Sequence, residues 1–196
     1  MAGALAGIRV IDFGQYVSGP MAAMLLADQG ADVIRIDPPG GPRFESPANA
    51  TYNRGKRSIV LDLKSPGDFE TARKLVASAD VVIENFRPGT MARLGLGAEA
   101  MTREHARLIY CSMPGFAATD PRAGIAAWEG TIAAATVTYP ANAQTGRPTF
   151  TPLPFSSSYA AFLAAVSLAM ALNARERDGL GQSIEIAAPG QPSARV

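Results

Sequence analysis

Basic side chains gather at two places where a ligand with phosphate groups could be held. Four of them flank the β-branched run 58–63, and these are Arg54, Lys56, Arg57 and Lys64. Two more, Arg87 and Arg93, follow the run 80–83. Guanidinium and ammonium groups form charge-assisted hydrogen bonds to phosphate oxygens. From the residue pattern alone we favour the other interpretation, that these are solvated charges in loops.

One carboxylate lies in an unusual setting. Glu129 follows Trp128 inside an otherwise apolar stretch. A buried carboxylate without a partner is costly. We therefore expect Glu129 either to reach a cleft or to have a specific partner. Ser18 and Ser65 each stand where a helix is predicted to start, and capping alone accounts for both.

Other reactive groups give little support for a catalytic site. His105 is the only histidine and lies in a polar helical stretch, so we interpret it as a surface residue. The single cysteine, Cys111, lies in an apolar run and is predicted to be a buried core thiol rather than a catalytic thiolate. There is neither a Gly-x-Gly-x-x-Gly motif after the first predicted strand nor a Walker-type loop, and no metal site is predicted.

The composition limits the classes of partner. With 47% apolar and 18% charged residues, the chain has the composition of a folded domain. A formal net charge of +1 argues against nucleic acid or an anionic membrane as a partner. No secretory signal is visible, and no segment is expected to span a bilayer; residues 159–172 are interpreted as a buried helix. We therefore expect a cytoplasmic protein.

Short β-branched runs alternate with helical runs along the chain. Strands are predicted over 8–13, 32–36, 58–63, 80–83, 107–112 and 182–187. Helices are predicted over 18–28, 65–79, 126–136 and 156–177, with Ser156 or Ser157 as the last cap. This alternation predicts an α/β domain over residues 1–187, with helices on both faces of a parallel sheet, and a tail over 188–196.

Ligands of such sheets bind beyond the carboxyl ends of the strands. That rule points to residues 13–15, 63–64, 84–86 and 112–115. The loop over 38–55 and the four-proline stretch over 139–155 are predicted to be irregular connections.

At this point the sequence resembles a known family, the class III CoA-transferases, which include formyl-CoA transferase, carnitine CoA-transferase and the α-methylacyl-CoA racemases. The matching stretches are LAGIRVIDFGQYVSGPMAAMLLADQGADVIRID, NRGKRSIVLDLKSPGD, ADVVIENFRPGTMARLGLG, RLIYCSMPGF and ARERDGLGQSIEIA. They occur in the order of the family and cover residues 5–187. The resemblance implies a Rossmann-like domain that binds coenzyme A.

The resemblance also assigns positions to the CoA site. Those that match CoA contacts of the family are Val17, Ser18, Leu61 to Lys64, Asn85, Phe86, Arg87 and Arg93. For Lys64 and Arg93 the resemblance therefore favours binding to a phosphate over the interpretation as solvated loop charges. Residues 126–129 match a stretch that borders the CoA thiol.

In such enzymes an aspartate attacks the acyl-CoA thioester, and an incoming carboxylic acid later takes the CoA. The sequence departs from this pattern, because the position of that aspartate falls on Ser157. We interpret Ser157 as a helix cap. Glu129 is the remaining carboxylate in the central region, and our hypothesis is that it is an assisting or substitute catalytic group.

A second departure concerns length. The resemblance implies a second domain, which this sequence lacks, and a dimer. A fragment, one half of a split pair and a shortened form all stay open, and we expect a homodimer or a partner chain that supplies the missing domain. The leading interpretation is CoA transfer between an acyl-CoA and a small carboxylic acid; the alternative is a catalytically silent subunit that binds CoA. A racemase is disfavoured because Trp128 stands where its histidine would fall.

Overall fold

The computed structural model describes residues 3–44 and 46–187, and these form one parallel sheet with helices on both faces. The strands are β1 (Arg9–Asp12), β2 (Asp32–Asp37), β3 (Arg57–Val60), β4 (Val81–Glu84), β5 (Ile109–Ser112) and β6 (Ser183–Glu185). Their order across the sheet is β3-β2-β1-β4-β5-β6, and each neighbouring pair is parallel. The predicted α/β class is confirmed, although β3 ends three residues earlier than expected. The predicted tail, 188–196, lies outside the described residues.

Seven helices occur in the described part of the chain. They are α1 (Ser18–Asp28), α2 (Pro47–Tyr52), α3 (Pro66–Ala77), α4 (Thr90–Arg93), α5 (Ala98–Glu104), α6 (Glu129–Ala135) and α7 (Phe155–Asp178). Of these, α1, α3 and α7 agree with the predicted helices within two residues, and α6 is shorter than predicted. The sequence interpretation missed α2 and α4, and it placed His105 on a helix that ends one residue before it.

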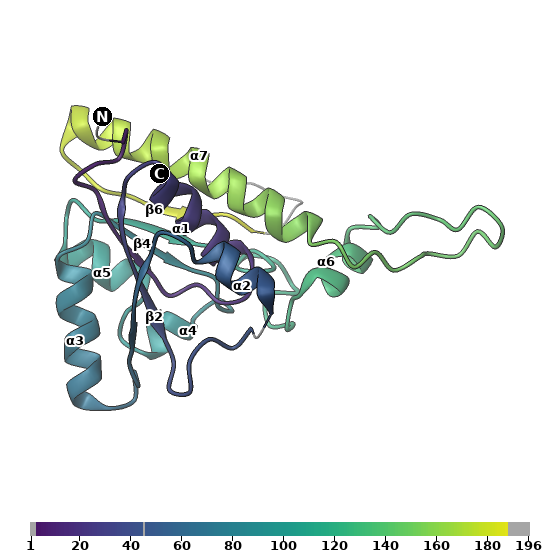
Figure 1. Cartoon of the computed structure of the whole chain (residues 1–196), viewed down its shortest axis with the longest axis horizontal. Helices are drawn as coiled ribbons and strands as arrows, with labels where there is room; N and C mark the ends of the chain where they lie inside the picture. Colours follow the sequence, from purple (N-terminus) through teal and green to yellow (C-terminus); the bar gives the residue numbers. More distant parts are fainter. Residues whose placement is uncertain (1–2, 45, 188–196) are drawn as a thin grey trace.

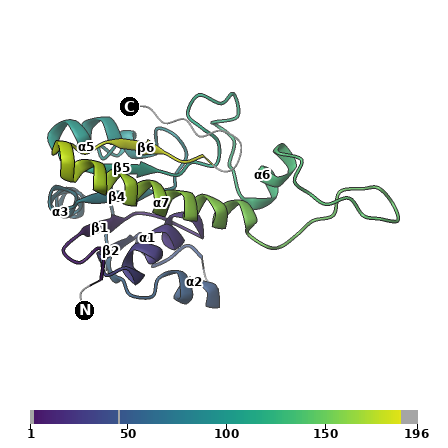
Figure 2. The same ribbon diagram turned by 90° about the horizontal axis from the view of Figure 1, so that it is seen from above.

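Alternate side chains of the inner strands pack into two separate hydrophobic cores, one on each face of the sheet. Val10, Ile83 and Cys111 face a cluster with α1 and α7, while Ile11, Val82 and Tyr110 face a cluster with α3, α4 and α5. The sheet is therefore the middle layer of three, with α1 and α7 together on one face (Figure 2). Because both faces are covered, the inner strands are apolar on both sides, as predicted.

The helix α7 is buried on one face only. Small residues such as Ala160, Ala161 and Ala164 pack against α1 and β5, and Arg175 pairs with Asp80 at the far end. By length and composition alone α7 could cross a membrane. Its packing on α1 makes it a partly buried core helix.

Residues 137–153, which we call the arm, project away from the body between α6 and α7 (Figure 1). The arm folds back on itself, with an antiparallel bridge between Ala141 and Pro148. At its base the hydroxyl of Tyr139 donates to the carbonyl of Gly130 at 2.9 Å. This segment is the predicted proline-rich connection, and most of it is exposed.

Candidate functional site

One side chain, Asn85, joins the loops that follow β1 and β4. Its Oδ1 accepts a hydrogen bond from the backbone N–H of Gln15 at 2.7 Å, and its Nδ2 donates to the Gln15 carbonyl at 2.7 Å. Nδ2 also donates to Oγ of Ser18, at 3.1 Å, in the first turn of α1. The strand order reverses between β1 and β4, which is where open parallel sheets bind ligands. Asn85 therefore holds both walls of that crevice in place.

The turn from β1 into α1 is tight. A Cβ atom at position 14 would lie 2.8 Å from Cα of Gly19, so glycine is required at Gly14. Two residues later Tyr16 has a φ of 64°, in the left-handed region that non-glycine residues rarely adopt. Its exposed ring lies 6.1 Å from the ring of Phe44. Such strain persists where the surrounding structure fixes it, often at functional sites.

A buried ion pair lies beneath this turn. Nζ of Lys56 is 2.8 Å from Oδ2 of Asp12, and the two side chains are 1% and 0% exposed. The ammonium also donates to the Pro20 carbonyl at 2.8 Å and to Oδ1 of Asn53 at 2.9 Å. The other carboxylate oxygen of Asp12 accepts the N–H of Gly14 at 2.7 Å. Lys56 thus has no free proton for a ligand, and its interpretation as a loop charge was wrong.

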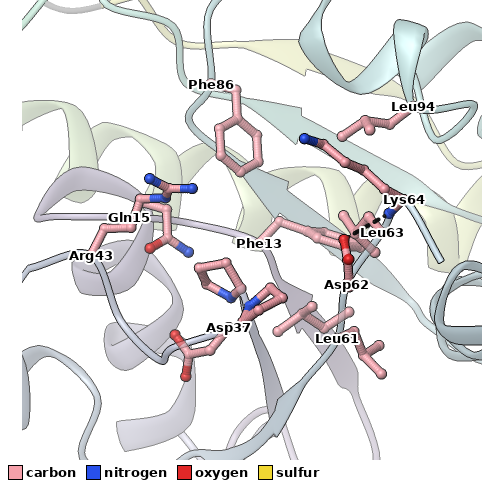
Figure 3. A pocket seen from close by; sticks show the side chains of 13 residues that line it. Phe13, Gln15, Asp37, Arg43, Leu61, Asp62, Leu63, Lys64, Phe86 and Leu94 are labelled. Atoms are coloured by element: carbon pink, nitrogen blue, oxygen red, sulfur yellow. Dashed lines mark hydrogen bonds between the residues drawn. The ribbon is translucent and has the colours of Figure 1, made fainter.

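A pocket of about 390 Å³ opens at the carboxyl ends of β1, β2 and β3. Apolar side chains make most of its wall, with a few polar groups among them, as in other small-molecule sites. It is lined by Phe13, Gln15, Ile36, Asp37, Pro38, Pro39, Arg43, Leu61, Asp62, Leu63, Lys64, Phe86 and Leu94. Figure 3 shows the ring of Phe86 between Arg43 on one side and the Lys64 ammonium on the other.

The acids of the pocket are engaged by neighbouring groups. Oδ1 of Asp37 lies 2.8 Å from Nε of Arg35, with both side chains buried, although the N–H is not aligned for a hydrogen bond. Oδ1 of Asp62 accepts the backbone N–H of Lys64 at 3.0 Å. Among the described residues, no carboxylate lies within ion-pair distance of Arg43 or Lys64. The pocket therefore offers two cations to an anionic ligand.

Glu129 lies at a second place, where α6 and α7 both begin. Its carboxylate accepts the N–H of Ser156 at 2.6 Å, the N–H of Ser157 at 3.1 Å and the hydroxyl of Ser157 at 2.8 Å. This arrangement binds an anion to the positive end of a 24-residue helix. Glu129 was expected either to reach a cleft or to have a specific partner, and it does both. Besides its bonds to the serines, it lines a pocket of about 570 Å³ with Tyr139 and Tyr159.

The comparison with known proteins decides the family. The sequence pattern described as "CoA-transferase family III" matches residues 5–192. The chain belongs to this family. This match confirms the family that was recognised from the sequence. The family acts on CoA thioesters.

Individual relatives agree with the assignment. The chain is 46% identical over 190 residues to the CoA-transferase/lyase DddD of Marinomonas sp., covering 93% of this chain and 22% of that protein. It is 38% identical over 206 residues to the succinyl-CoA:mesaconate CoA-transferase of Haloarcula hispanica, covering 94% and 52%. The crystal structure of Rv3272 from Mycobacterium tuberculosis superposes with a TM-score of 0.89 at 32% identity, covering 95% and 55%. The chain therefore spans about half the length of most of these relatives and less of DddD.

The structure places the CoA contacts expected from the family in three groups. Leu61, Lys64 and Phe86 line the pocket. Ser18 and Asn85 adjoin it through the hydrogen bonds of the β1 and β4 loops, and Val17 is the residue before α1. Arg87 and Arg93 are exposed and outside the lining, and Arg93 donates to Oγ1 of Thr90 at 3.2 Å.

Sequence reasoning missed Arg43, which lies in the loop between β2 and α2. That loop was predicted to be irregular, and it was not connected with the basic clusters. The available signal was the topology, since the loop leaves the carboxyl end of a strand beside β1. Arg54 and Arg57, by contrast, pair with Asp28 and Asp32 at the surface.

Capping by serine was predicted at three helices; the position is right at α3, where Ser65 is the N-cap residue, and wrong at α1 and α7. Val17 precedes α1, and the hydroxyl of Ser18 accepts from Asn85 instead. Ser65 makes no side-chain cap bond. Helix α7 starts at Phe155, so Ser157 lies within its first turn and donates to Glu129. In a member of this family, the position of the expected nucleophile thus holds a hydroxyl that is bonded to a carboxylate.

The other side chains that could be reactive, Cys111 and His105, lie outside the pockets described above. Burial raises the pKa of Cys111 to about 12, and the residue is a core thiol, as predicted. His105 is half-buried and follows the last residue of α5. Within residues 3–44 and 46–187, no group of three or more metal-binding side chains converges.

Glu84, at the carboxyl end of β4, is a buried acid beside the crevice. Burial raises its pKa, and the nearby Glu185 adds to this effect. Hydrogen bonds from the Phe86 N–H, at 2.8 Å, and from Ser112 act in the opposite direction. The protonated form is therefore favoured by folding.

Replacement of Glu84 by Gln is expected to change how stability depends on pH. A raised pKa in the folded state means that the contribution of Glu84 is fully present at acid pH and is lost as pH rises through the folded pKa. The free energy of unfolding of Glu84→Gln should therefore rise relative to the natural chain between pH 4 and pH 8, by about 1.4 kcal/mol per unit of pKa difference. Urea denaturation across this range measures it, and parallel curves would contradict it.

Proposed function

We propose that the protein binds a CoA thioester with its nucleotide end in the strand-end pocket, and that it transfers CoA between an acyl-CoA and a carboxylic acid. The observation that carries the proposal is the pocket at the carboxyl ends of β1, β2 and β3, with apolar walls and the cations Arg43 and Lys64. The apolar wall fits an adenine ring, and the cations fit its phosphates.

The names of relatives support the transfer reaction. The relative from Haloarcula hispanica is named for CoA transfer from succinyl-CoA to mesaconate, and DddD is named as both transferase and lyase. Small carboxylic acids are therefore the proposed acceptors. Within this chain we propose that Glu129 assists the reaction at the thiol end, because it lines a pocket of its own beside the start of α7.

One observation favours a second candidate, a catalytically silent subunit that binds CoA. The Glu129 carboxylate already accepts three hydrogen bonds. Such a carboxylate would have to give up hydrogen bonds before it could attack a thioester. The family resemblance adds that Ser157 falls at the expected position of the nucleophile. No imidazole is near enough in the described structure to activate the serine hydroxyl.

Calorimetric titration with CoA tests the binding step. We expect saturable binding of CoA to the natural chain. The affinity should weaken about tenfold or more in Lys64→Gln, because this variant loses a charge-assisted hydrogen bond to the ligand. Lys74→Gln, an exposed lysine on α3, is the matched control and should bind as the natural chain does. Absence of binding to the natural chain would refute the proposal.

Intact-mass spectrometry after incubation with succinyl-CoA separates the two candidates. A covalent CoA adduct that disappears in Glu129→Gln supports transfer through this residue. Binding without an adduct supports the silent subunit. Unchanged turnover in Glu129→Gln would remove Glu129 from the mechanism.

We also propose that further polypeptide covers the outer face of α7. Tyr159, Phe162, Val166 and Met170 form one stripe there, and they are 58%, 52%, 58% and 68% exposed. Large exposed apolar patches mark interaction surfaces. The relatives extend well beyond the matched region. We therefore infer that polypeptide corresponding to that extension, in the same protein or in a partner, is the occupant.

Light scattering during size-exclusion chromatography tests this surface. Co-expression with the second half of a relative should give a stable complex that Val166→Glu prevents. Glu176→Lys, on the polar last turn of α7, is a control that should leave the complex intact. A stable complex of Val166→Glu, or a dimer of this chain alone that uses the same stripe, would contradict the assignment of the occupant.

The proposed compartment is the cytoplasm. Its support is the single buried cysteine, which fits a reducing environment, and the proposed use of a CoA thioester. Fractionation of cells that express the natural protein, followed by immunoblotting, tests it, and recovery in the membrane fraction would refute it.

A further inference from the structure

The side chains of Ser157 and Glu129 form a pair of a hydroxyl and a carboxylate. Oγ of Ser157 donates to Oε2 of Glu129 at 2.8 Å, a distance typical of a nucleophile and its general base. The carboxylate is held in turn by the backbone N–H groups of Ser156, at 2.6 Å, and of Ser157, at 3.1 Å. The pair therefore has the parts of an activated nucleophile: a hydroxyl, a base that can take its proton, and groups that orient the base.

This pair lies beside a cavity. Glu129 and Ser156 line the pocket of about 570 Å³, and the rest of its wall is mostly apolar, with side chains from α6, the arm and α7. The wall residues Leu153 and Tyr159 are 55% and 58% exposed, so the pocket is open to water. Among the described residues that line it there is no lysine or arginine. An uncharged acyl chain therefore suits the pocket better than one that ends in a carboxylate, which Glu129 would repel.

The pair also lies on the ligand side of the sheet. Arg175, near the end of α7, pairs with Asp80, the residue that precedes β4, so the end of α7 lies at the amino ends of the strands. With 24 residues α7 is about 36 Å long, whereas a four-residue strand spans about 13 Å. The first turn of α7 therefore lies beyond the carboxyl ends of the strands, and Figure 2 shows the helix beginning on the side toward which β5 and β6 point. Ligands of parallel sheets bind on this side.

We propose that Ser157 is a nucleophile with Glu129 as its general base, and that the chain hydrolyses uncharged acyl-CoA thioesters through a seryl ester. In the first step Oγ bonds to the thioester carbonyl carbon, the C–S bond breaks, and the proton of the hydroxyl passes through Glu129 to the departing thiolate of CoA. In the second step water attacks the ester carbon, and Glu129 transfers a proton from that water to Oγ as the acid leaves. The sum is acyl-CoA and water giving a carboxylic acid and CoA. This activity goes beyond the proposed transfer and shares with it only the binding of a CoA thioester.

The chemistry of the ester favours hydrolysis over CoA transfer. An oxygen ester lies lower in free energy than a thioester, so CoA does not readily take the acyl group back from Ser157. A carboxylate nucleophile would instead form an anhydride, which CoA can open. Attack by Ser157 also leaves the two backbone bonds of Glu129 in place, whereas attack by Glu129 itself would break them. Water is therefore the acceptor that fits this nucleophile.

The reaction is expected to be slow, because the first turn of α7 has no spare N–H group for the oxyanion. Two of its N–H groups bond Glu129, and those of Phe155 and Ser158 bond backbone carbonyls at 2.9 Å. The lack of one oxyanion donor costs a factor of about 10²–10³ in rate. An oxygen ester is also less reactive than a thioester, so the second step is the slower one and the seryl ester should accumulate.

Intact-mass spectrometry of the full natural chain after incubation with butyryl-CoA tests for the ester. We expect a mass increase of one butyryl group without CoA, and peptide mapping should place this group on Ser157. A thiol reagent should record the release of CoA as the ester forms. The absence of both signals would overturn this inference, and so would a butyryl group mapped to another residue.

Two variants and a control test the roles within the pair. Ser157→Ala should abolish the ester, and Glu129→Gln should slow its formation about 100-fold or more, the usual contribution of a general base. Ser158→Ala, at the next serine of the same turn, should react as the natural chain does. Thermal melting checks that each variant folds. An unchanged rate of ester formation in Glu129→Gln would overturn the assignment of the base.

The same spectra separate this inference from the proposed function. A covalent CoA adduct without a butyryl ester would overturn the hydrolysis and support the transfer. A butyryl ester on Ser157, with no CoA adduct after incubation with succinyl-CoA, would support the hydrolysis and count against the transfer.

Discussion

Replacement of Asp12 by Asn is expected to lower the free energy of unfolding by about 3–5 kcal/mol. The change leaves the ammonium of Lys56 buried without its counter-charge, because that side chain is 1% exposed. The remaining acceptors, the Pro20 carbonyl and the Asn53 side chain, are neutral. Burial already lowers the pKa of Lys56, and the Asp12 carboxylate opposes that effect. Urea denaturation at pH 7 measures the loss.

Two controls separate this effect from a general sensitivity to charge. Arg54→Gln breaks a surface pair with Asp28 and should cost less than about 1 kcal/mol. The double variant Asp12→Asn with Lys56→Met removes both charges and should be more stable than Asp12→Asn alone. A loss of less than about 1 kcal/mol in Asp12→Asn would show that water or a rearranged loop reaches the lysine.

Conversion of Ser157 to Asp, which places an acid where the resemblance predicts the nucleophile, is expected to lower the free energy of unfolding at pH 7 by about 2 kcal/mol. The hydroxyl that it replaces donates to Glu129 at 2.8 Å. Two carboxylates about 4 Å apart repel by about 4 kcal/mol at a surface-like dielectric, and rotation toward solvent relieves part of this. Denaturation at pH 7 and at pH 4 measures the cost.

The pH dependence identifies the cause. Repulsion raises the pKa of one carboxyl, so the penalty should grow as pH rises and should shrink once that group is protonated. Addition of Glu129→Gln to Ser157→Asp removes one charge and should restore most of the stability at pH 7. Equal losses at both pH values would instead point to the lost hydrogen bond. The double variant then offers a free carboxylate at position 157 for the test of a CoA adduct.

Much of the fold was predictable because its signals are local. Proline lies near the start of α1, α3 and α7, glycine follows the end of α1 and α7, and β-branched runs mark the strands between them. The helices α2 and α4 have six and four residues, too few for an apolar period to be visible. The start of α2 does have a local signal, since Ser46 caps it and Pro47 is its first residue, but this signal lay within the loop that was predicted to be irregular.

The site was predictable only in part. Leu61, Lys64 and Phe86 were found through the family resemblance, and all three line the pocket. Arg43 was missed because no local pattern tells which residue of an irregular loop faces a strand end. The bond between Glu129 and Ser157 was also missed, since the arm separates them in sequence and only the tertiary structure brings them together.

The same bond has a consequence for where the chain tolerates insertions. Because Glu129 and the start of α7 are fastened together, the segment between them is a closed loop whose two ends are fixed by the body. Doubling the length of such a loop costs only about 0.6 kcal/mol in closure entropy. Insertions at the exposed tip of the arm, over residues 142–147, are therefore expected to cost little stability and to leave the strand-end crevice unchanged.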